Sequence, residues 1–129
     1  MVLIEEAVIG REFEIAVMGN EFPVASLPGE HVIEGHTFFN YDSKYKDAKT
    51  VLMAPAEVDE KVEDDIRELA VKVYKLLGCS GLARVDIFYS NEGEFKVNEV
   101  NTFPGFTEHS LYPLLWEPSS DFTLKEVIE

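Results

Sequence analysis

The sequence predicts an α+β domain in which a mostly antiparallel sheet is backed by helices. Two patterns support this: short apolar runs that alternate with polar residues between turn signals, and one long segment with apolar residues at every third or fourth position. The first is typical of strands joined by hairpins, and the second of an amphipathic helix packed on a sheet. At 129 residues, 46% of them hydrophobic, the chain has the size of one domain with a modest core.

The amino-terminal part predicts two strands and a hairpin. Residues 2–4 form a short apolar run, and residues 12–17 alternate between large apolar side chains and polar or small ones. Gly19 and Asn20 predict a tight turn, after which Pro23 favours an edge position or a bulge. From residue 27 to 54 several Gly, Asn and Asp residues predict a long loop, and such a loop in a compact domain is usually functional.

The segment after this loop predicts the main helix. Asp59 is suited to cap it, and Gly78 is suited to end it. Its apolar positions are Val62, Ile66, Leu69, Ala70, Val73 and Leu77. Because this spacing places them on one side, we expect the helix to support the sheet and to carry no chemistry.

The carboxy-terminal end predicts shorter helical pieces. Residues 110–116 predict a turn or a short helix that Pro113 interrupts. Thr123 and Glu126 have the spacing of a capping box, which predicts a final helix that runs to the last residue.

Four polar residues on the predicted second hairpin are the first candidates for chemistry. Arg84 and Asp86 are two residues apart, as are Glu99 and Asn101, and a turn is predicted at residues 91–93 between them. Residues two apart in a strand point to the same face, so each pair shares a face.

The register of this hairpin decides whether the two pairs meet. If Phe88 pairs with Phe95, all four side chains lie on one face, whereas a slip of one residue would separate the pairs. Asp86 and Glu99 about 4 Å apart would repel by roughly 4 kcal/mol at an effective dielectric constant of about 20, so a positive charge is expected between them. Arg84 is one source of that charge.

A divalent metal ion is the other source. Oxygen atoms from Asp, Glu and Asn suit Mg²⁺ or Mn²⁺, which keep waters and phosphate oxygens as further ligands. From spacing alone, a surface salt bridge on a solvated hairpin is the more common arrangement and is favoured over the metal site.

The bulk composition excludes several classes of function. A net charge of −14 argues against nucleic acid or an anionic membrane as a partner. The three histidines lack zinc-site spacing and are interpreted as polar surface or loop residues; the P-loop and dinucleotide-binding motifs are also missing. With no apolar run approaching about 20 residues, the sequence predicts a cytoplasmic protein.

The hairpin resembles the carboxy-terminal signature of D-alanine–D-alanine ligases, in the ATP-grasp superfamily. The match includes the R-x-D at residues 84–86, thirteen residues from Asp86 to Glu99, the E-x-N-T-x-P-G at residues 99–105, and residues 107–111. Three upstream segments recur in the family's order, at residues 4–6, 10–12 and 39–45. The resemblance runs from Val2 to about Ile128, and it implies that residues 1–129 form the large subdomain of an ATP-grasp domain.

The resemblance implies an ATP site in which each matching residue has a role. Glu5 matches the carboxylate near the adenine amino group, Val8 the backbone donor to the ring, and Glu12 the acceptor of the ribose hydroxyls. Phe88 packs either on adenine or in the core. Two residues of the long loop match a phosphate ligand and a lid that excludes water, namely Lys44 and Tyr45.

The resemblance also implies a reaction centre. Asp86, Glu99 and Asn101 match the ligands of two Mg²⁺ or Mn²⁺ ions, with Glu99 placed to bridge them. Arg84 and the backbone N–H of Gly105 match groups that stabilise the phosphoryl group and the tetrahedral intermediate. Two further residues match the site for the second substrate's carboxylate, namely Ser110 and the amide of Leu111.

The implied reaction uses ATP to phosphorylate one D-alanine, whose acyl phosphate is then attacked by the amine of a second D-alanine, for peptidoglycan synthesis. The implied enzyme is a bacterial cytoplasmic homodimer. The family's amino-terminal domain and its small ATP-grasp subdomain have no counterpart in these residues, so we expect the chain alone to be inactive. The alternatives are a D-alanine–D-serine or D-lactate ligase, another ATP-grasp carboxylate–amine ligase, and a non-catalytic binding module.

Overall fold

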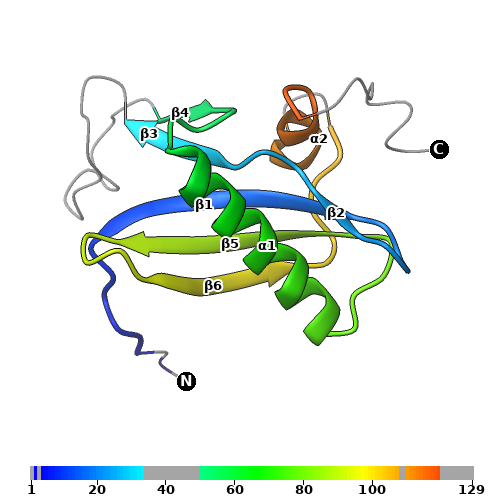
Figure 1. Ribbon diagram of the computed structural model, residues 1–129, viewed down its shortest axis with the longest axis horizontal. Coiled ribbons are helices and arrows are strands. Elements are labelled where there is room, and N and C mark those ends of the chain that lie inside the picture. The colour runs from blue at the N-terminus through cyan, green and yellow to red at the C-terminus, as the bar shows by residue number, and fades with distance from the viewer. Residues whose placement is uncertain (1, 3, 34–49, 108–109, 120–129) are drawn as a thin grey trace.

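The sheet and its helices form the architecture that the sequence predicts. The computed structural model describes residues 2, 4–33, 50–107 and 110–119. Its elements are β1 (Gly10–Met18), β2 (Val24–Ala25), β3 (Gly29–Ile33), β4 (Thr50–Met53), α1 (Glu60–Leu76), β5 (Leu82–Ser90), β6 (Phe95–Asn101) and α2 (Leu111–Trp116). The strands pair antiparallel in the order β4-β3-β1-β5-β6, with β2 also paired to β1. Figure 1 shows α1 lying across one face of this sheet.

Strand β1 is the centre of the sheet, and its alternating sequence separates the two faces. Phe13, Ile15 and Val17 are fully buried and belong to the core cluster under α1. Glu12 and Glu14 point to the opposite face, because successive side chains of a strand alternate. Strand β1 therefore places two carboxylates on the sheet face opposite α1.

Helix α1 confirms the predicted main helix. Ile66, Ala70 and Tyr74 are fully buried against β1 and β5. Asp59 is at the N-cap, where its backbone oxygen accepts a hydrogen bond from the Glu63 N–H at 2.9 Å, while its side chain makes no cap hydrogen bond. The apolar spacing, rather than side-chain capping, therefore decides where this helix lies.

Two predictions for the amino-terminal half are wrong. Val2 and Ile4 are 85% and 88% exposed and lie outside the strands, and no described strand pairs with them. The loop predicted for residues 27–54 contains β3 and β4, which pair with each other and, through β3, with β1. Gly29, interpreted as a loop breaker, is a packing position, because a Cβ there would collide with Leu115.

The first hairpin and the short helix also depart in detail from prediction. The connection from β1 to β2 spans residues 19–23, not a two-residue turn. Pro113 does not interrupt α2, because it lies in the first turn, where a backbone N–H has no partner within the helix. The final helix predicted around Thr123 and Glu126 lies outside the described residues.

Helix α2 covers one end of the sheet face opposite α1. Tyr112, Leu115 and Trp116 pack against Ala16 of β1, and the Tyr112 hydroxyl donates a hydrogen bond to the Val17 carbonyl at 2.9 Å. The rest of this face keeps its polar side chains. Neither described helix is long and apolar enough to cross a membrane.

Candidate active site

The hairpin β5–β6 brings the two predicted pairs together by a different register from the predicted one. Phe88 pairs with Lys96, not with Phe95, a one-residue difference that alone would place the pairs on opposite faces. A β-bulge beyond this point adds one residue to β6 and shifts the register by one more residue. This second shift returns the side chains of both pairs to one face of the sheet.

Beyond the bulge, the four polar residues are direct neighbours. Arg84 lies opposite Asn101, and Asp86 lies opposite Glu99. All four therefore share the face opposite α1, because residues directly opposite in a pair of strands point to the same side.

The Arg84 guanidinium supplies the positive charge between the two carboxylates. Its Nε and Nη2 atoms are each 2.7 Å from an Asp86 carboxylate oxygen, and Nη2 is 3.3 Å from Glu99 Oε1. The Asp86 side chain is 6% exposed, whereas that of Glu99 is 59% exposed. Hydrogen bonding to Asp86 raises the pKa of Arg84, so the guanidinium stays charged at every pH of interest.

The donor set of this cluster fits a hard divalent ion. Mg²⁺ is usually held by one or two carboxylates together with phosphate oxygens, and Asp86 and Glu99 supply the two carboxylates. The Asn101 side-chain oxygen already accepts a hydrogen bond from the Phe103 N–H at 3.0 Å, and a carbonyl oxygen has a second lone pair. Among the described residues no group of three or more His, Cys, Asp or Glu is placed to hold a metal ion. Phosphate oxygens and waters, which Mg²⁺ usually keeps as ligands, would complete the coordination.

Gly105 and Ser110 lie in contact beyond the end of β6. A Cβ added to Gly105 would lie 2.8 Å from Ser110 Oγ. That hydroxyl accepts a hydrogen bond from the Thr107 N–H at 2.9 Å, and Ser110 is the N-cap residue of α2. The predicted substrate-binding Leu111 is the first residue of that helix.

The predicted nucleotide-binding residues of the sheet form a row beside the carboxylate cluster. Phe88 is half-buried, with Glu12 opposite it on β1 and Lys96 opposite it on β6. The Asn98 amide donates a hydrogen bond to Glu12 Oε1 at 3.0 Å. This row therefore combines an aromatic ring, a carboxylate, an amide and a cation.

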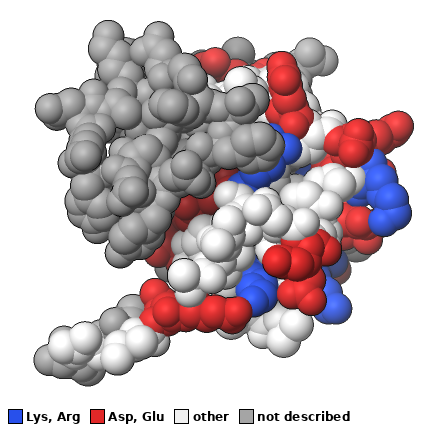
Figure 2. Space-filling view, turned by 90° about the vertical axis from the view of Figure 1, so that its left-hand side faces the viewer, with Lys and Arg blue, Asp and Glu red and all other residues white. Residues whose placement is uncertain are grey.

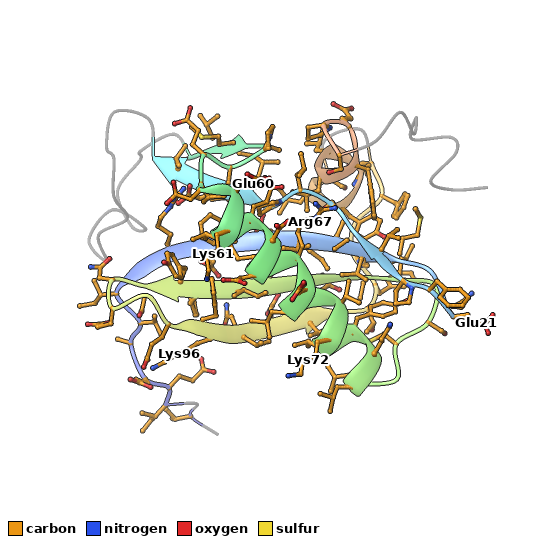
Figure 3. All side chains as sticks on the ribbon, viewed as in Figure 1. Glu21, Glu60, Lys61, Arg67, Lys72 and Lys96 are labelled. Carbon is orange, nitrogen blue, oxygen red and sulfur yellow. The ribbon has the colours of Figure 1, made fainter. Side chains whose placement is uncertain are left out.

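The amino-terminal segment runs along the outer edge of this row. Glu6 makes an ion pair with Lys96 at 3.0 Å, and Figure 3 shows Lys96 at the side of the sheet near this segment. Glu5 is exposed and Val8 is half-buried. Hydrogen bonding to Glu6 raises the pKa of Lys96.

A family model described as D-ala D-ala ligase C-terminus matches residues 1–129. The chain belongs to this family. It is 50% identical over 128 residues to the D-alanine–D-alanine ligase of Finegoldia magna, covering 99% of this chain and 36% of that protein.

Two solved structures have the same fold. The D-alanine–D-alanine ligase of Coxiella burnetii superposes with a TM-score of 0.78 at 37% identity, covering 96% of this chain and 31% of that one. The VanG D-Ala:D-Ser ligase of Enterococcus faecalis gives 0.80 at 37% identity, covering 96% and 36%. The chain thus spans about a third of the length of the relatives it matches.

Sequence reasoning missed the ion pair between Glu14 and His31 on the sheet face opposite α1, which is the candidate active-site face. Glu14, 8% exposed, lies opposite Asp86, and its Oε2 is 3.4 Å from Nε2 of His31 on β3. His31 is therefore a strand residue of this face and not a loop residue, and its side chain is 34% exposed. The alternation of polar and apolar residues continues after Glu12, and this pattern places Glu14 on the same face as Glu12. His31 was missed because residues 27–54 were predicted to form a loop.

The Glu14–His31 pair perturbs the histidine. Hydrogen bonding to Glu14 raises the pKa of His31; the negative charge of Glu12 adds to the increase, while burial and Arg84 oppose it. The contact between His31 Nε2 and Glu14 Oε2 is long, at 3.4 Å, and the other ring nitrogen, Nδ1, has no hydrogen-bond partner among the described residues.

Acidic side chains are prominent around this end of the molecule. Figure 2 shows several groups of Asp and Glu in red, with Lys and Arg in blue beside them, on the described part of this side. The chain has 25 acidic and 11 basic residues, so an anionic nucleotide depends on cations for binding.

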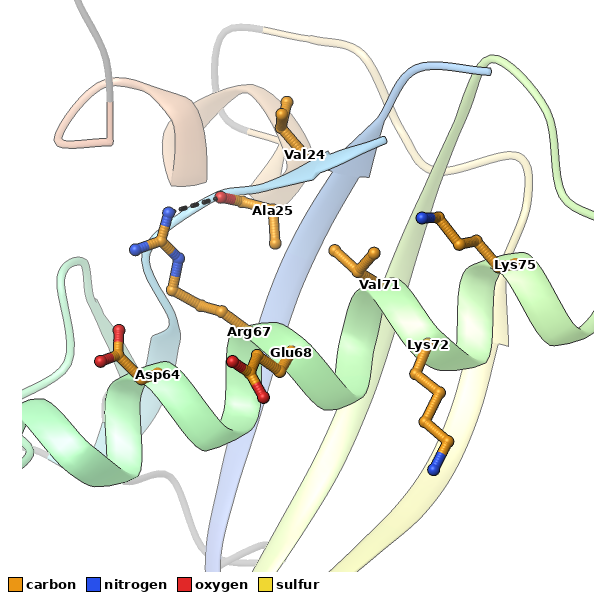
Figure 4. A pocket seen from close by; sticks show the side chains of 8 residues that line it. All are labelled: Val24, Ala25, Asp64, Arg67, Glu68, Val71, Lys72 and Lys75. Carbon is orange, nitrogen blue, oxygen red and sulfur yellow. Dashed lines mark hydrogen bonds between the residues drawn. The ribbon is translucent and has the colours of Figure 1, made fainter. Parts of the chain in front are cut away.

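A pocket of about 560 Å³ lies on the other side of the sheet, between α1 and β2. Figure 4 shows Arg67 reaching across it to the Ala25 carbonyl at 3.1 Å. This pocket is separated from Arg84 and Asp86 by the sheet, so it contributes nothing to the reaction centre. The predicted lid residues Lys44 and Tyr45 lie outside the described residues.

Proposed function

We propose that this chain forms the metal-binding and nucleotide-binding wall of a D-alanine–D-alanine ligase that uses ATP. The observation that carries the proposal is the cluster of Arg84, Asp86, Glu99 and Asn101 on one face of the sheet. Half the residues are identical to the ligase of Finegoldia magna. Because the chain spans only about a third of that relative, the reaction requires the segments that the relative has in addition.

ATP binds along the polar row of the active-site face in this proposal. Phe88 packs on adenine, Glu5 accepts from its amino group, and the Val8 backbone donates to the ring. Glu12 accepts from the ribose hydroxyls, as an acceptor-only carboxylate can. The ribose then lies between the adenine and the carboxylates of Asp86 and Glu99. The triphosphate extends from the ribose toward the reaction centre.

Asp86, Glu99 and Asn101 would hold the divalent metal. When bound, Mg²⁺ neutralises the triphosphate and polarises the transferred phosphoryl group. Arg84 donates a planar fork of N–H groups to the negative charge that develops at the reacting carboxylate.

The reaction has two steps, and the second step occurs near Gly105 and Ser110. The carboxylate of the first D-alanine attacks the terminal phosphorus of ATP, giving an acyl phosphate and ADP. The amine of the second D-alanine then attacks the acyl carbon, and phosphate leaves. Ser110 and the Leu111 amide hold the carboxylate of the second D-alanine, while the Gly105 N–H stabilises the tetrahedral oxyanion. Lys44 and Tyr45 lie outside the described residues, and the roles proposed for them are those that the family resemblance implies, a ligand of the terminal phosphate and a lid that excludes water.

The whole protein is proposed to work in the bacterial cytoplasm as a homodimer. Support comes from the relatives, which are bacterial ligases. In this proposal the residues of this chain bind and position the substrates, but they do not complete the reaction. The chain alone is therefore expected to release no ADP when D-alanine is added. D-alanine-dependent ADP release by these residues alone would contradict this division of labour.

Calorimetry with Mg-ATP tests the binding part of the proposal. Asp86→Ala and Glu99→Ala are expected to abolish the metal-dependent heat, while Glu68→Ala on α1, on the opposite side of the sheet, leaves it unchanged. Equal heats in all four proteins would favour a non-catalytic module instead.

D-serine is the second candidate for the acceptor, because the VanG D-Ala:D-Ser ligase shares the fold at a TM-score of 0.80. Mass spectrometry of the product distinguishes the two when the whole protein is offered D-alanine, D-serine and D-lactate together. D-Alanyl-D-alanine is the expected dominant product, and dominant D-alanyl-D-serine or D-alanyl-D-lactate would overturn the assignment.

A further inference from the structure

Asn98 is the additional residue that the β-bulge places on β6. Asp86 pairs with Glu99 and Ile87 pairs with Val97, so Asn98 lies between two paired positions and has no partner of its own on β5. Its side-chain amide is nevertheless engaged, donating a hydrogen bond to Glu12 Oε1 at 3.0 Å. The bulge thus places Glu99 opposite Asp86, and it also leaves the Asn98 side chain free to reach β1, two strands away.

The hydrogen bond spans the full width of a strand. Asn98 is on β6 and Glu12 is on β1, with β5 between them, so the two backbones are separated by about 10 Å, twice the usual strand spacing. Both side chains therefore extend across β5, near the step from Asp86 to Phe88. The bridge lies where the face changes from the aromatic row to the carboxylate cluster.

This position suits a sugar better than a base or a phosphate. A nucleotide that packs on Phe88 and sends its phosphates toward Asp86 has to place its ribose near the bridge. A carboxylate offers about four acceptor positions, so Glu12 can accept from Asn98 and from a ribose hydroxyl at once. The amide holds the carboxylate in one orientation before the nucleotide arrives, and that reduces the ordering cost of binding.

We propose that Asn98 is a positioning residue that fixes Glu12 for the ribose hydroxyls of ATP. The inference rests on the proposed function, and it adds a residue outside the site set implied by the family resemblance. Asn98 is exposed and Glu12 is half-buried, so their hydrogen bond adds little to folding stability. Its effect is therefore expected in nucleotide binding, and specifically in the part that depends on the ribose.

Titrations followed by NMR, which measure weak binding reliably, test this with ATP and 2′,3′-dideoxy-ATP in the presence of Mg²⁺. Asn98→Ala is expected to weaken ATP binding about three- to tenfold, the effect of one net hydrogen bond, and to change dideoxy-ATP less than about twofold. Asn98→Asp removes the donor and adds a negative charge that faces Glu12, so it should weaken ATP binding at least as much as Asn98→Ala. Asn98→Gln keeps the amide and should recover most of the affinity.

Asn91→Ala is the matched control, because Asn91 is an exposed asparagine in the β5–β6 turn, and it should bind both nucleotides like the parent chain. Equal weakening of both nucleotides by Asn98→Ala would show a general structural role and overturn the inference, as would no weakening. A parent chain that binds no Mg-ATP would refute the proposed function and the inference together, whereas binding that is insensitive to Asn98 would refute only the inference.

Discussion

Arg84 holds both carboxylate oxygens of Asp86, with Nε–Oδ1 and Nη2–Oδ2 distances of 2.7 Å each. The two side chains are 15% and 6% exposed, so this is a partly buried, bidentate pair on the candidate active-site face. The same two oxygens are the ones proposed to hold a divalent ion. The pair consequently affects both the stability of the hairpin and the affinity of the metal site.

Asp86→Asn is expected to lower the free energy of unfolding by about 1–3 kcal/mol, because it leaves a mostly buried guanidinium without its main anion. Glu99→Gln should change it by less than about 0.5 kcal/mol, since the Glu99 side chain is 59% exposed and surface ion pairs contribute little. Urea unfolding of the two variants and the parent checks this. Equal destabilisation by the two variants would contradict the prediction that the buried carboxylate of Asp86 contributes more to stability than the exposed one of Glu99.

Arg84→Ala is expected to raise the affinity for Mn²⁺ in the absence of nucleotide, by about three- to tenfold, since it frees both Asp86 oxygens from charge-assisted hydrogen bonds. Lys96→Ala is the control, because it also removes a cation from this face but Lys96 pairs with Glu6. Electron paramagnetic resonance of free Mn²⁺ measures both. An equal rise in the two variants would mean that only net charge matters.

The sequence predicted the shared face of the four residues, but not how the chain achieves it. Their spacing of two within each strand was sufficient to pair them. The bulge at Asn98 was not predictable, since neither Gly nor Pro marks it and an exposed strand edge tolerates an extra residue. The predicted register and the actual one differ by one residue at Phe88 and by two residues beyond the bulge. Because side chains alternate along a strand, a difference of two returns the four residues to one face.

The strands β3 and β4 were missed because their stability comes from neighbours distant in the sequence. Gly29 resembles a loop breaker locally, yet in the sheet it makes room for Leu115 of α2. Short strands of this kind depend on pairing with β1 more than on their own composition. Helix α1 was predictable because its apolar spacing extends over several turns within one segment.

Gly105→Ala is expected to destabilise the protein by about 1–2 kcal/mol, because its Cβ would lie 2.8 Å from Ser110 Oγ, which is bonded to Thr107. In a Ser110→Ala background the same change should cost less than half as much, since that oxygen is gone. Thermal unfolding of the two single variants and the double variant measures the coupling. Additive effects would contradict the contact.

Arg11→Lys is expected to lower the free energy of unfolding by about 1–3 kcal/mol. The Arg11 guanidinium donates to both oxygens of Glu30, at 2.8 and 2.6 Å, and to the Glu57 carbonyl at 2.9 Å. A lysine cannot reproduce this fork, and the Glu30 side chain is only 8% exposed. Lys61→Ala, which breaks an exposed pair with Asp65, is the control, and a loss as small as that of the control would contradict the prediction.

His31 is expected to titrate above its ordinary pKa, because Glu14 stabilises the charged ring. Its folded pKa is raised, so the stabilisation from this pair is fully present below the unfolded value of about 6.5 and is lost as the pH rises through the folded pKa. Glu14→Gln should lower the pKa of His31 and flatten the dependence of unfolding free energy on pH above about 6.5. Titration of the ring protons by NMR, with the His31 signals assigned from their loss in His31→Gln, measures the shift. An unchanged titration of His31 in Glu14→Gln would mean that the carboxylate, 3.4 Å away, does not control the ring.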